Sequence, residues 1–247
     1  MFEDKSGSKF DYSESIHPSN AQSASFCFGI SVDCIVLGYQ SGSLRVLLVE
    51  RGVSPFEGYW ALPGDLMKID ENLKDAAARI LFQLTGLKKI FFKQFRTFGG
   101  VNRHPLGRVL TVGFFSLVKS ENFNPLPAAW ARNTKWWDIQ ELPELAFDHR
   151  LIIEKGLERL RKKAKRESIG FELLPKKFTL LELQRTFEAI FGTIYDKPNF
   201  RKKILSMNIL DDLEEWQTNV SHRPAKLYSF NKSKYKNQKN RGFQFEF

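Results

Sequence analysis

A chain of 247 residues is long enough for one medium-sized domain and one small one, and 42% hydrophobic residues with 27% charged residues predict a buried core rather than a disordered chain. The formal net charge is +10, and the excess is local, because residues 151–247 carry 21 Lys and Arg against 12 Asp and Glu. This concentration favours a polyanionic partner such as nucleic acid, although a solvated basic surface explains the charge alone equally well.

The apolar stretches are too short for a membrane protein. None reaches the roughly 18 residues that a spanning helix requires, and the polar N-terminal segment has no signal-peptide core. The two cysteines, Cys27 and Cys34, adjoin a strand-like run in no metal-binding or redox spacing, so we expect small core residues. These features predict a cytoplasmic protein with no membrane partner.

The first elements in chain order are predicted to be strands. Residues 1–25 are polar with few aliphatic side chains and predict a disordered tail. Apolar runs over 28–39 and 44–50 flank a short polar turn, which predicts two neighbouring strands. Further strands are expected over 91–98, 109–118 and 134–138.

Two helices interrupt or follow these strands. Apolar residues recur at helical spacing from Leu73 to Leu84, and Gly86 stands where a helix C-terminus favours a left-handed residue. A second helix is predicted from His149 to Lys165, because Lys and Arg gather at its end, where the helix dipole is negative. Strands interrupted by helices predict one α+β domain over residues 26–166.

The segment that follows begins with a strong helix signal. Thr179 and Glu182 have the spacing of a capping box, in which each side chain bonds to the backbone of the other residue. An apolar stripe follows and ends at Gly192. We therefore predict a helix that starts after Thr179.

A second helix and a hairpin complete this small domain. Pro198 is well placed in a first helical turn, and Phe200, Ile204 and Met207 share one face of the helix after it. Two strand-like runs then flank a polar turn. Helix, helix and hairpin are the plan of a winged helix-turn-helix domain, predicted over 167–230, with residues 231–247 as a loose basic tail.

The segment from Trp60 to Leu87 carries a recognisable motif. Anchored on Thr85-Gly86-Leu87 and preceded by Trp60-Ala61-Leu62-Pro63-Gly64, it resembles the Nudix signature G-x5-E-x7-R-E-U-x-E-E-x-G-U. Glu71 then matches the first Glu of the signature, Arg79 matches its Arg, and Asp65 stands in place of the leading Gly. The resemblance implies an α+β fold, a Nudix-like α/β/α sandwich with a mixed sheet.

Three carboxylates of that signature are missing. Ile80, Gln83 and Leu84 occupy the positions from which Nudix hydrolases present oxygens to Mg²⁺. Two aliphatic side chains and an amide cannot supply near-octahedral oxygen ligands, and without the metal neither the diphosphate nor the attacking water is activated. We therefore expect no enzyme activity, no catalytic residue, no metal and no other cofactor, and we expect Glu71 and Arg79 to pair with each other.

Three C-terminal segments are more specific. Residues 170–180 (GFELLPKKFTL), 196–203 (DKPNFRKK) and 223–228 (RPAKLY) are similar to the LLP-x-x-FTL, D-x-x-NFR and RPA-x-LY segments of the Nudix-related transcriptional regulators, a bacterial family that joins a Nudix domain to a winged helix. Among its branches, the chain most resembles the arabinose-responsive regulators of Bacteroidetes, which sense a sugar. Another branch senses ADP-ribose-like molecules.

The resemblance implies a ligand-responsive repressor in which a small effector, bound by the Nudix domain, lowers the affinity for operator DNA. A two-fold protein matches a two-fold site, so a homodimer on a palindromic duplex is expected. The second helix and the hairpin would contact bases or phosphates, since Arg and Asn read guanine and adenine. The expected DNA-binding residues are Lys197, Asn199, Arg201, Lys202, Lys203, His222, Arg223 and Lys226, and the expected effector-pocket residues are Arg51, Trp60, Asp65, Arg103 and Asp148.

Other interpretations remain open at this point. Each DNA-binding side chain could be an ordinary surface charge, and each pocket residue could serve folding alone. A Nudix hydrolase of nucleoside diphosphate derivatives is the alternative function, and a basic module that binds protein or RNA is a third.

Overall fold

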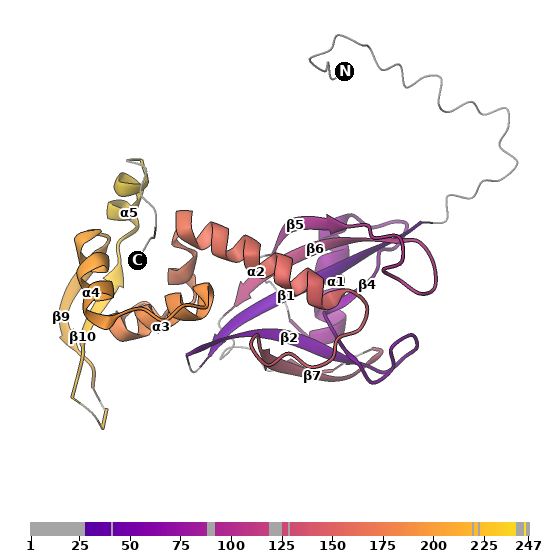
Figure 1. The fold of residues 1–247 in the computed structure, drawn as a ribbon, viewed down its shortest axis with the longest axis horizontal. Helices are drawn as coiled ribbons and strands as arrows, with labels where there is room; N and C mark the ends of the chain where they lie inside the picture. The colour runs from indigo at the N-terminus through magenta and orange to yellow at the C-terminus, as the bar shows by residue number, and fades with distance from the viewer. Residues whose placement is uncertain are drawn as a thin grey trace, which may run out of the picture.

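The computed structural model of the chain describes residues 28–40, 42–87, 92–118, 125–127, 129–218, 220–221, 223–240 and 245. The predicted tail over 1–25, Cys27 and His222 lie outside these residues. The described part forms a sheet domain and a smaller C-terminal domain, and a long helix runs from the first to the second (Figure 1). Within the described residues, no helix has the length and apolarity needed to cross a membrane.

The larger domain is built on a mixed sheet of seven strands. Strands β1 and β6 pair in parallel, and the other pairs in this sheet are antiparallel. The order is β3-β2-β1-β6-β5, with β4 also pairing with β1 and β7 with β2. The strands are β1 (Gly29–Gln40), β2 (Ser43–Arg51), β3 (Trp60–Ala61), β4 (Gly64–Leu66), β5 (Lys93–Phe98), β6 (Val109–Val118) and β7 (Ala131–Asp138).

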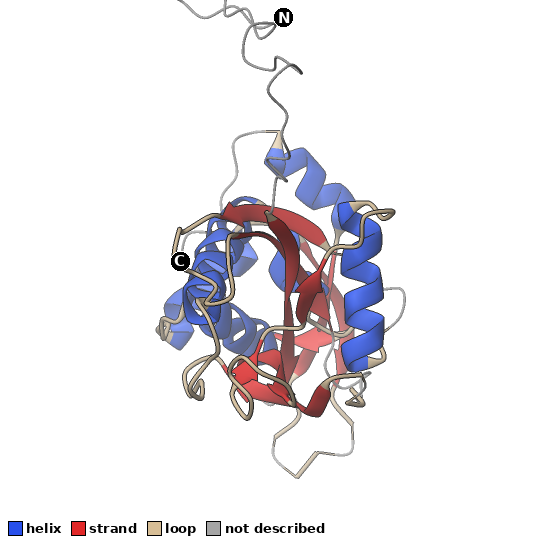
Figure 2. Ribbon diagram, turned by 90° about the vertical axis from the view of Figure 1, so that its right-hand side faces the viewer, coloured by secondary structure: helices blue, strands red, loops and turns tan. Residues whose placement is uncertain are grey.

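Helices cover both faces of this sheet (Figure 2). Helix α1 (Leu73–Thr85) packs on the face that includes Val32 and Cys34, and α2 (His149–Arg166) packs on the face that includes Ile35 and Leu37. Since β1 is buried on both sides, its middle is a continuous run of apolar residues rather than an alternating one. The α/β/α sandwich is therefore confirmed.

The predicted strands and helices of this domain are present, with differences at the edges. Gly86 has a φ of 72° and ends α1, as expected from its position. Strand β7 starts at Ala131, three residues before the predicted start. The prediction left out residues 131–133 because they show no alternation of apolar residues. Strands β3 and β4 were not predicted, because two or three residues are too few to show a period of two.

The C-terminal domain has the predicted order of elements. Thr179 and Glu182 form the full capping box, and Gly192 ends α3 with a φ of 68°. Strands β8, β10 and β9 form a three-stranded antiparallel sheet in that order. The elements are the 3-10 helix η3 (Ser168–Glu172), β8 (Phe178–Thr179), α3 (Leu180–Phe191), α4 (Lys197–Ser206), β9 (Leu210–Trp216) and β10 (Lys226–Phe230).

The two domains share part of one core. Ile190 of α3 is buried in the same cluster as Leu160 and Ala164 of α2. The Nε atom of Arg161 in α2 donates a hydrogen bond to the backbone oxygen of Ile190 at 3.0 Å. Helix α2 therefore belongs to the sheet domain at its start and holds the small domain at its end (Figure 1).

The prediction of a loose tail after residue 230 is wrong for the described part of that segment. Helix α5 (Lys232–Lys239) starts at Asn231, whose side chain accepts a hydrogen bond from the Lys234 backbone. Tyr235 and Phe245 are buried in the small domain's core, and the Phe245 backbone donates to Lys165 of α2 at 2.7 Å. One aromatic residue among eight shows no helical period, so only tertiary packing reveals this helix.

Phe245→Ala is expected to destabilise the small domain. The side chain is 1% exposed among Phe171, Phe187 and Tyr235, and removing a buried Phe typically costs about 3 to 5 kcal/mol. Urea unfolding followed by circular dichroism measures the change. Phe28→Ala, at a position that is 57% exposed, is the control. Equal and small losses in both variants would contradict the packed position of Phe245.

Candidate functional site

A cavity of about 260 Å³ opens where β1, β4 and the end of β2 meet the first residues of α2. Carboxylates, cations and aromatic rings share its wall. The polar and aromatic residues that line it are Ser31, Asp33, Arg51, Asp65, Arg103, His104, Trp130, Phe147 and His149.

Three of the five predicted pocket residues line this cavity, namely Arg51, Asp65 and Arg103. Asp148 is one step removed, because it pairs with Arg103. Trp60 is not among the lining residues. Its ring packs edge-on against Trp137 at 5.2 Å, within the cluster on the α2 face of the sheet. Sequence reasoning could not choose between these positions, because the side on which a strand residue points depends on how the strand pairs.

Arg51 is a buried cation held between two rings. Its guanidinium lies 5.0 Å from the centre of the Trp130 ring and 4.9 Å from that of Phe147, and its Nε donates to the Pro55 oxygen at 2.7 Å. Burial lowers its pKa. No carboxylate of the described residues forms an ion pair with it. Asp33 and Asp65 attract it from beyond ion-pair distance. Because burial of the charge is costly, an anionic ligand in direct contact would be stabilised there.

Arg103 joins the cavity to the start of α2. Its Nη2 and Nε donate to the two carboxylate oxygens of Asp148 at 2.7 and 3.0 Å, and Nη2 lies 3.7 Å from Asp33. Such a two-pronged bond to a carboxylate fixes both partners in direction as well as distance. Asp148 is the residue that precedes α2, so this bond fixes the N-terminal end of the helix.

Asp33 and His149 form the floor of the cavity, and sequence reasoning missed both. The His149 Nδ1 accepts a hydrogen bond from the Leu62 backbone at 2.9 Å, which leaves the proton on Nε2, 3.8 Å from Asp33. Burial raises the pKa of Asp33 to about 7 and lowers that of His149 to about 3. A carboxylate inside the apolar run of β1 was the available signal, since an isolated charge in a buried strand is rare.

The approach of β4 to this floor requires glycine at one position. A Cβ atom on Gly64 would lie 1.8 Å from the Asp33 Oδ1.

The backbone of Phe147 shows a second constraint, because its φ of 54° is unusual for a bulky residue. That backbone lets the Phe147 ring stack on His104 at 5.0 Å while it faces Arg51. The cavity wall is therefore built around an aromatic platform.

The residues at the Nudix metal position do not fit Mg²⁺. Ile80 and Leu84 are 0% and 2% exposed, and both belong to the core beneath α1. Gln83 accepts a hydrogen bond from Arg79 at 3.1 Å. Among the described residues, no group of three or more His, Cys, Asp or Glu side chains could hold a metal ion. No hydrolytic step can be derived through these positions.

The predicted pairing of Glu71 with Arg79 is confirmed. The Arg79 Nε and Nη2 donate to the two Glu71 oxygens at 2.8 and 2.6 Å. Hydrogen bonding from Arg79 lowers the pKa of Glu71 to about 2. The Lys68 backbone also donates to Glu71 at 2.7 Å, so the carboxylate closes the loop before α1.

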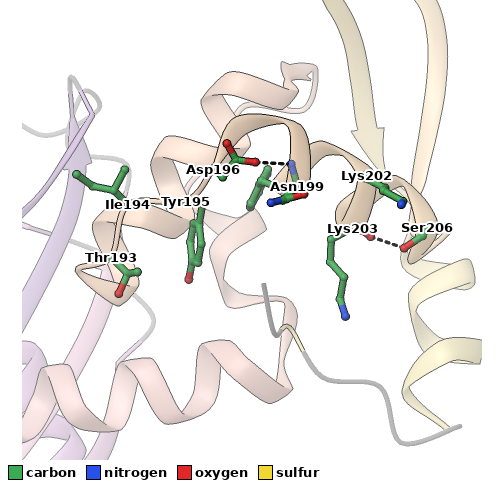
Figure 3. Close-up of a pocket in the computed structure, with 9 residues that line it drawn as sticks. Thr193, Ile194, Tyr195, Asp196, Asn199, Lys202, Lys203 and Ser206 are labelled. Carbon is green, nitrogen blue, oxygen red and sulfur yellow. Dashed lines mark hydrogen bonds between the residues drawn. The ribbon is translucent and has the colours of Figure 1, made fainter.

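In the small domain, the five predicted residues of α4 are exposed but do not share one side of the helix. Since successive residues turn by about 100°, Arg201 and Lys203 lie on opposite flanks. Arg201 lines a hollow of about 280 Å³ with Lys226 and Tyr228 of β10. On the other flank, a hollow of about 590 Å³ is lined by three further predicted residues, Asn199, Lys202 and Lys203, together with Ser206 (Figure 3). Lys197 is exposed in the first turn.

One predicted DNA-binding residue of the hairpin is engaged in an ion pair. Lys226 forms an ion pair with Asp212 at 2.5 Å, since the two residues are near neighbours on β10 and β9. Arg223 is exposed close to the turn, and Trp216 is 56% exposed at the end of β9. The N-terminus of α4 is closed by Asp196, whose side chain accepts from the Asn199 backbone at 3.0 Å (Figure 3).

Comparison with known proteins agrees with this two-part arrangement. Residues 28–157 match the family model of the NUDIX domain, and residues 170–230 match that of the NrtR DNA-binding winged helix domain. The crystal structure of Shewanella oneidensis NrtR with a 27mer DNA is 30% identical, with a TM-score of 0.67 over 87% of this chain and 97% of that chain. This chain belongs to the NrtR family. NrtR-type proteins of this build are transcriptional regulators with a Nudix domain and a DNA-binding winged helix.

Two curated relatives of this NrtR-type chain carry different names. The "ADPR responsive transcriptional repressor NtrR" of Acinetobacter baylyi is 29% identical over 205 residues, which are 81% of this chain and 81% of that protein. The "ADP-ribose pyrophosphatase" of Methanocaldococcus jannaschii is 30% identical over 110 residues, which are 44% of this chain and 64% of that protein. The first relative spans both domains, and the second matches a shorter stretch.

Asp33→Asn is expected to change how the stability of this NrtR-type chain depends on pH. The pKa of Asp33 is raised from 3.8 to about 7, so between these values the folded chain holds a proton that the unfolded chain releases, and stability falls as the pH rises. Asn has no such proton. From about pH 5 to about pH 7, the free energy of unfolding of the variant should therefore rise by about 1 to 3 kcal/mol relative to wild type.

His149 acts with the opposite sign. Its pKa is lowered from 6.5 to about 3, so below 6.5 the unfolded chain binds a proton that the folded chain does not, and stability falls as the pH falls. The two contributions oppose each other in the wild type, and only that of His149 remains in the variant. Urea unfolding at both pH values measures the difference, and an identical pH dependence in the two proteins would show that Asp33 is charged when folded.

Proposed function

We propose that the Nudix domain of this regulator binds ADP-ribose, or a closely related nucleoside diphosphate sugar, without hydrolysing it, and that this binding releases palindromic operator DNA from a homodimer. The observation that carries the proposal is Arg51, a buried guanidinium between two aromatic rings that has no carboxylate partner among the described residues. A diphosphate would supply the missing negative charge.

The rest of the wall suits the same ligand. Arg103 adds a second cation to the cavity wall, and His104, Trp130 and Phe147 offer ring faces on which a nucleobase can stack. A neutral pentose would leave Arg51 without a direct ion-pair partner among the described residues. The name of the Acinetobacter relative also favours the nucleotide. L-arabinose, the effector expected from the sequence resemblance, is the other effector to test, although the relatives of this chain do not support that branch.

Two further features support binding without turnover. The carboxylates that would hold Mg²⁺ are replaced by Ile80 and Leu84, which face the core, and Glu71 is already bonded to Arg79. Metal-dependent hydrolysis of the Nudix type needs oxygen ligands on this helix. We therefore propose a receptor rather than an enzyme.

Helix α2 supplies a physical route between the two sites. It starts at the cavity, where Asp148 is bonded to Arg103, and its far end is bonded to α3 through Arg161. An anion that draws on Arg103 competes with Asp148 for the same donors, which changes what holds the start of the helix. We place the domain boundary after residue 166, at the end of α2, so a tilt of this helix repositions α4.

Arg51→Gln is expected to weaken ADP-ribose binding by roughly 10-fold to 100-fold, since a charge-assisted bond contributes about 1.5 to 3 kcal/mol. Isothermal titration calorimetry with ADP-ribose and with L-arabinose measures it. Arg45→Gln, at the other end of β2 and away from the cavity, is the matched control and should bind as wild type does.

The same samples test turnover. We expect ADP-ribose to remain intact after incubation with the wild-type protein and Mg²⁺, as followed by chromatography of the nucleotide. Release of AMP well above background would contradict the receptor assignment. Tight binding of L-arabinose with no binding of ADP-ribose would contradict the nucleotide effector while leaving the regulator intact.

Arg201→Ala is expected to weaken specific DNA binding by about 1 to 3 kcal/mol. This side chain of α4 lines the hollow that α4 shares with strand β10 of the hairpin, where a base edge or phosphate would lie. Fluorescence anisotropy on a duplex selected by the wild-type protein measures the loss. Arg185→Ala, an exposed residue of α3 close to Tyr39 of β1, is the control within the same domain. Unchanged affinity in the Arg201 variant would show that the surface that contacts the DNA bases lies elsewhere on the domain.

A further inference from the structure

The last turns of α2 carry positive charges that the pocket and the helix contacts do not use. Lys162 and Lys165 are exposed, and no carboxylate of the described residues forms an ion pair with either. Cations near a helix C-terminus are common, because they face the negative end of its dipole. Their surroundings here give them a second role, since both line a concave surface.

That surface continues from α2 to α4. A hollow of about 660 Å³ is lined by Lys162 and Lys165 together with Thr193 and Tyr195 of the turn between α3 and α4. Thr193 and Tyr195 also line the hollow of about 590 Å³ beside α4. The two hollows are therefore neighbours, and we call them together the basic groove, with Lys162, Lys165, Thr193, Tyr195, Lys202 and Lys203 as its defining residues.

One side chain of the turn and one of α4 face the same space. Figure 3 shows Tyr195 and Lys203 pointing to one side of the turn, away from the N-terminal cap of α4. The Tyr195 ring is fixed there by stacking on Phe200 at 5.7 Å. Lysine ammonium groups and hydroxyl groups are both donors to phosphate oxygens.

The carboxylates of the groove are already engaged. Asp196 caps α4 by accepting from the Asn199 backbone at 3.0 Å, and Glu158 forms an ion pair with Lys155 at 2.7 Å. In the part of the chain that the structure describes, none of the four lysines of the groove has an ion-pair partner within 4.0 Å. Four cations around one concave surface raise the local positive potential and attract a polyanion.

We propose that the basic groove holds the phosphate backbone of duplex DNA next to the stretch contacted by α4, so that α2 of the Nudix domain contributes directly to DNA affinity. The inference rests on the proposed function, because it extends the DNA surface of the winged helix. The groove takes a duplex rather than a small anion, since its lysines are exposed and spread over two helices, whereas a small anion needs donors that converge on one point.

This placement gives α2 two tasks. Its first residues lie at the effector cavity, and its last turns would lie against DNA phosphates. A tilt of the helix would then change the position of α4 and the backbone contacts at the same time. The effector would then change DNA affinity in two ways, by shifting the lysines of α2 relative to the phosphates and by changing the spacing of the recognition helices.

The salt dependence of binding tests the inference. Each phosphate contact contributes about 0.9 to the slope of log K against log salt concentration, so the double variant Lys162→Gln with Lys165→Gln should lower the slope by about 1.8. The ratio of specific to non-specific affinity should stay unchanged, because phosphate contacts carry no sequence information. Fluorescence anisotropy of the full chain on a duplex selected by the wild-type protein measures both quantities.

The matched control is Lys68→Gln with Lys74→Gln, two exposed lysines near α1 on the opposite face of the sheet, which removes the same net charge. The inference predicts a wild-type slope for this control. Equal slopes in the two double variants would overturn it, since net charge alone would then explain the effect. A wild-type slope in the α2 variant, with normal binding by the wild-type protein, would overturn only this inference, whereas absence of DNA binding by the wild type would overturn the proposed function as well.

Discussion

The bond between Arg103 and Asp148 is the interaction on which the arrangement of this protein depends. Both carboxylate oxygens of Asp148 accept from the guanidinium, and Asp148 immediately precedes α2. This bond therefore connects the wall of the candidate cavity to the start of the long helix. The far end of that helix shares a core with α3 and donates to its last turn through Arg161. A ligand that competes for Arg103 therefore acts on the element that positions the second domain.

The replacement of the signature carboxylates by Ile80, Gln83 and Leu84 has a consequence for electrostatics. In a metal-dependent Nudix site, Mg²⁺ neutralises the diphosphate, and the carboxylates hold the metal. Here, aliphatic residues at those positions belong to the core, and the positive charge in the cavity comes from guanidinium groups instead. Arg51 is held between Trp130 and Phe147, so the charge and the ring faces are supplied by the same small set of side chains. On the proposed function, such a site would hold an anionic nucleotide without supplying the metal ligands that its cleavage requires.

Much of the fold could be predicted from local sequence. The capping box at Thr179, the left-handed glycines at 86 and 192, and the apolar face of α4 are all present as expected, because each depends on residues within one or two helical turns. The site was harder to predict. Arg51, Asp65 and Arg103 line the cavity, but Trp60 does not, and Asp33 and His149 went unnoticed because strand pairing and the docking of α2 bring them together from distant parts of the chain.

The sequence by itself determined the two domain types, the regulator family and the absence of carboxylates at positions 80, 83 and 84, since residue identity and spacing decide those features. The arabinose-responsive branch that it also predicted is not supported by the relatives. Tertiary structure alone decided which charged side chains form ion pairs and which polar segments fold. Lys226 is paired with Asp212, Arg51 is left without a carboxylate partner among the described residues, and the polar segment after residue 230 forms a helix whose Tyr235 enters the core. The physical reason is distance: the interaction of charges and the burial of side chains depend on separations of a few ångströms in space, which position along the chain does not specify.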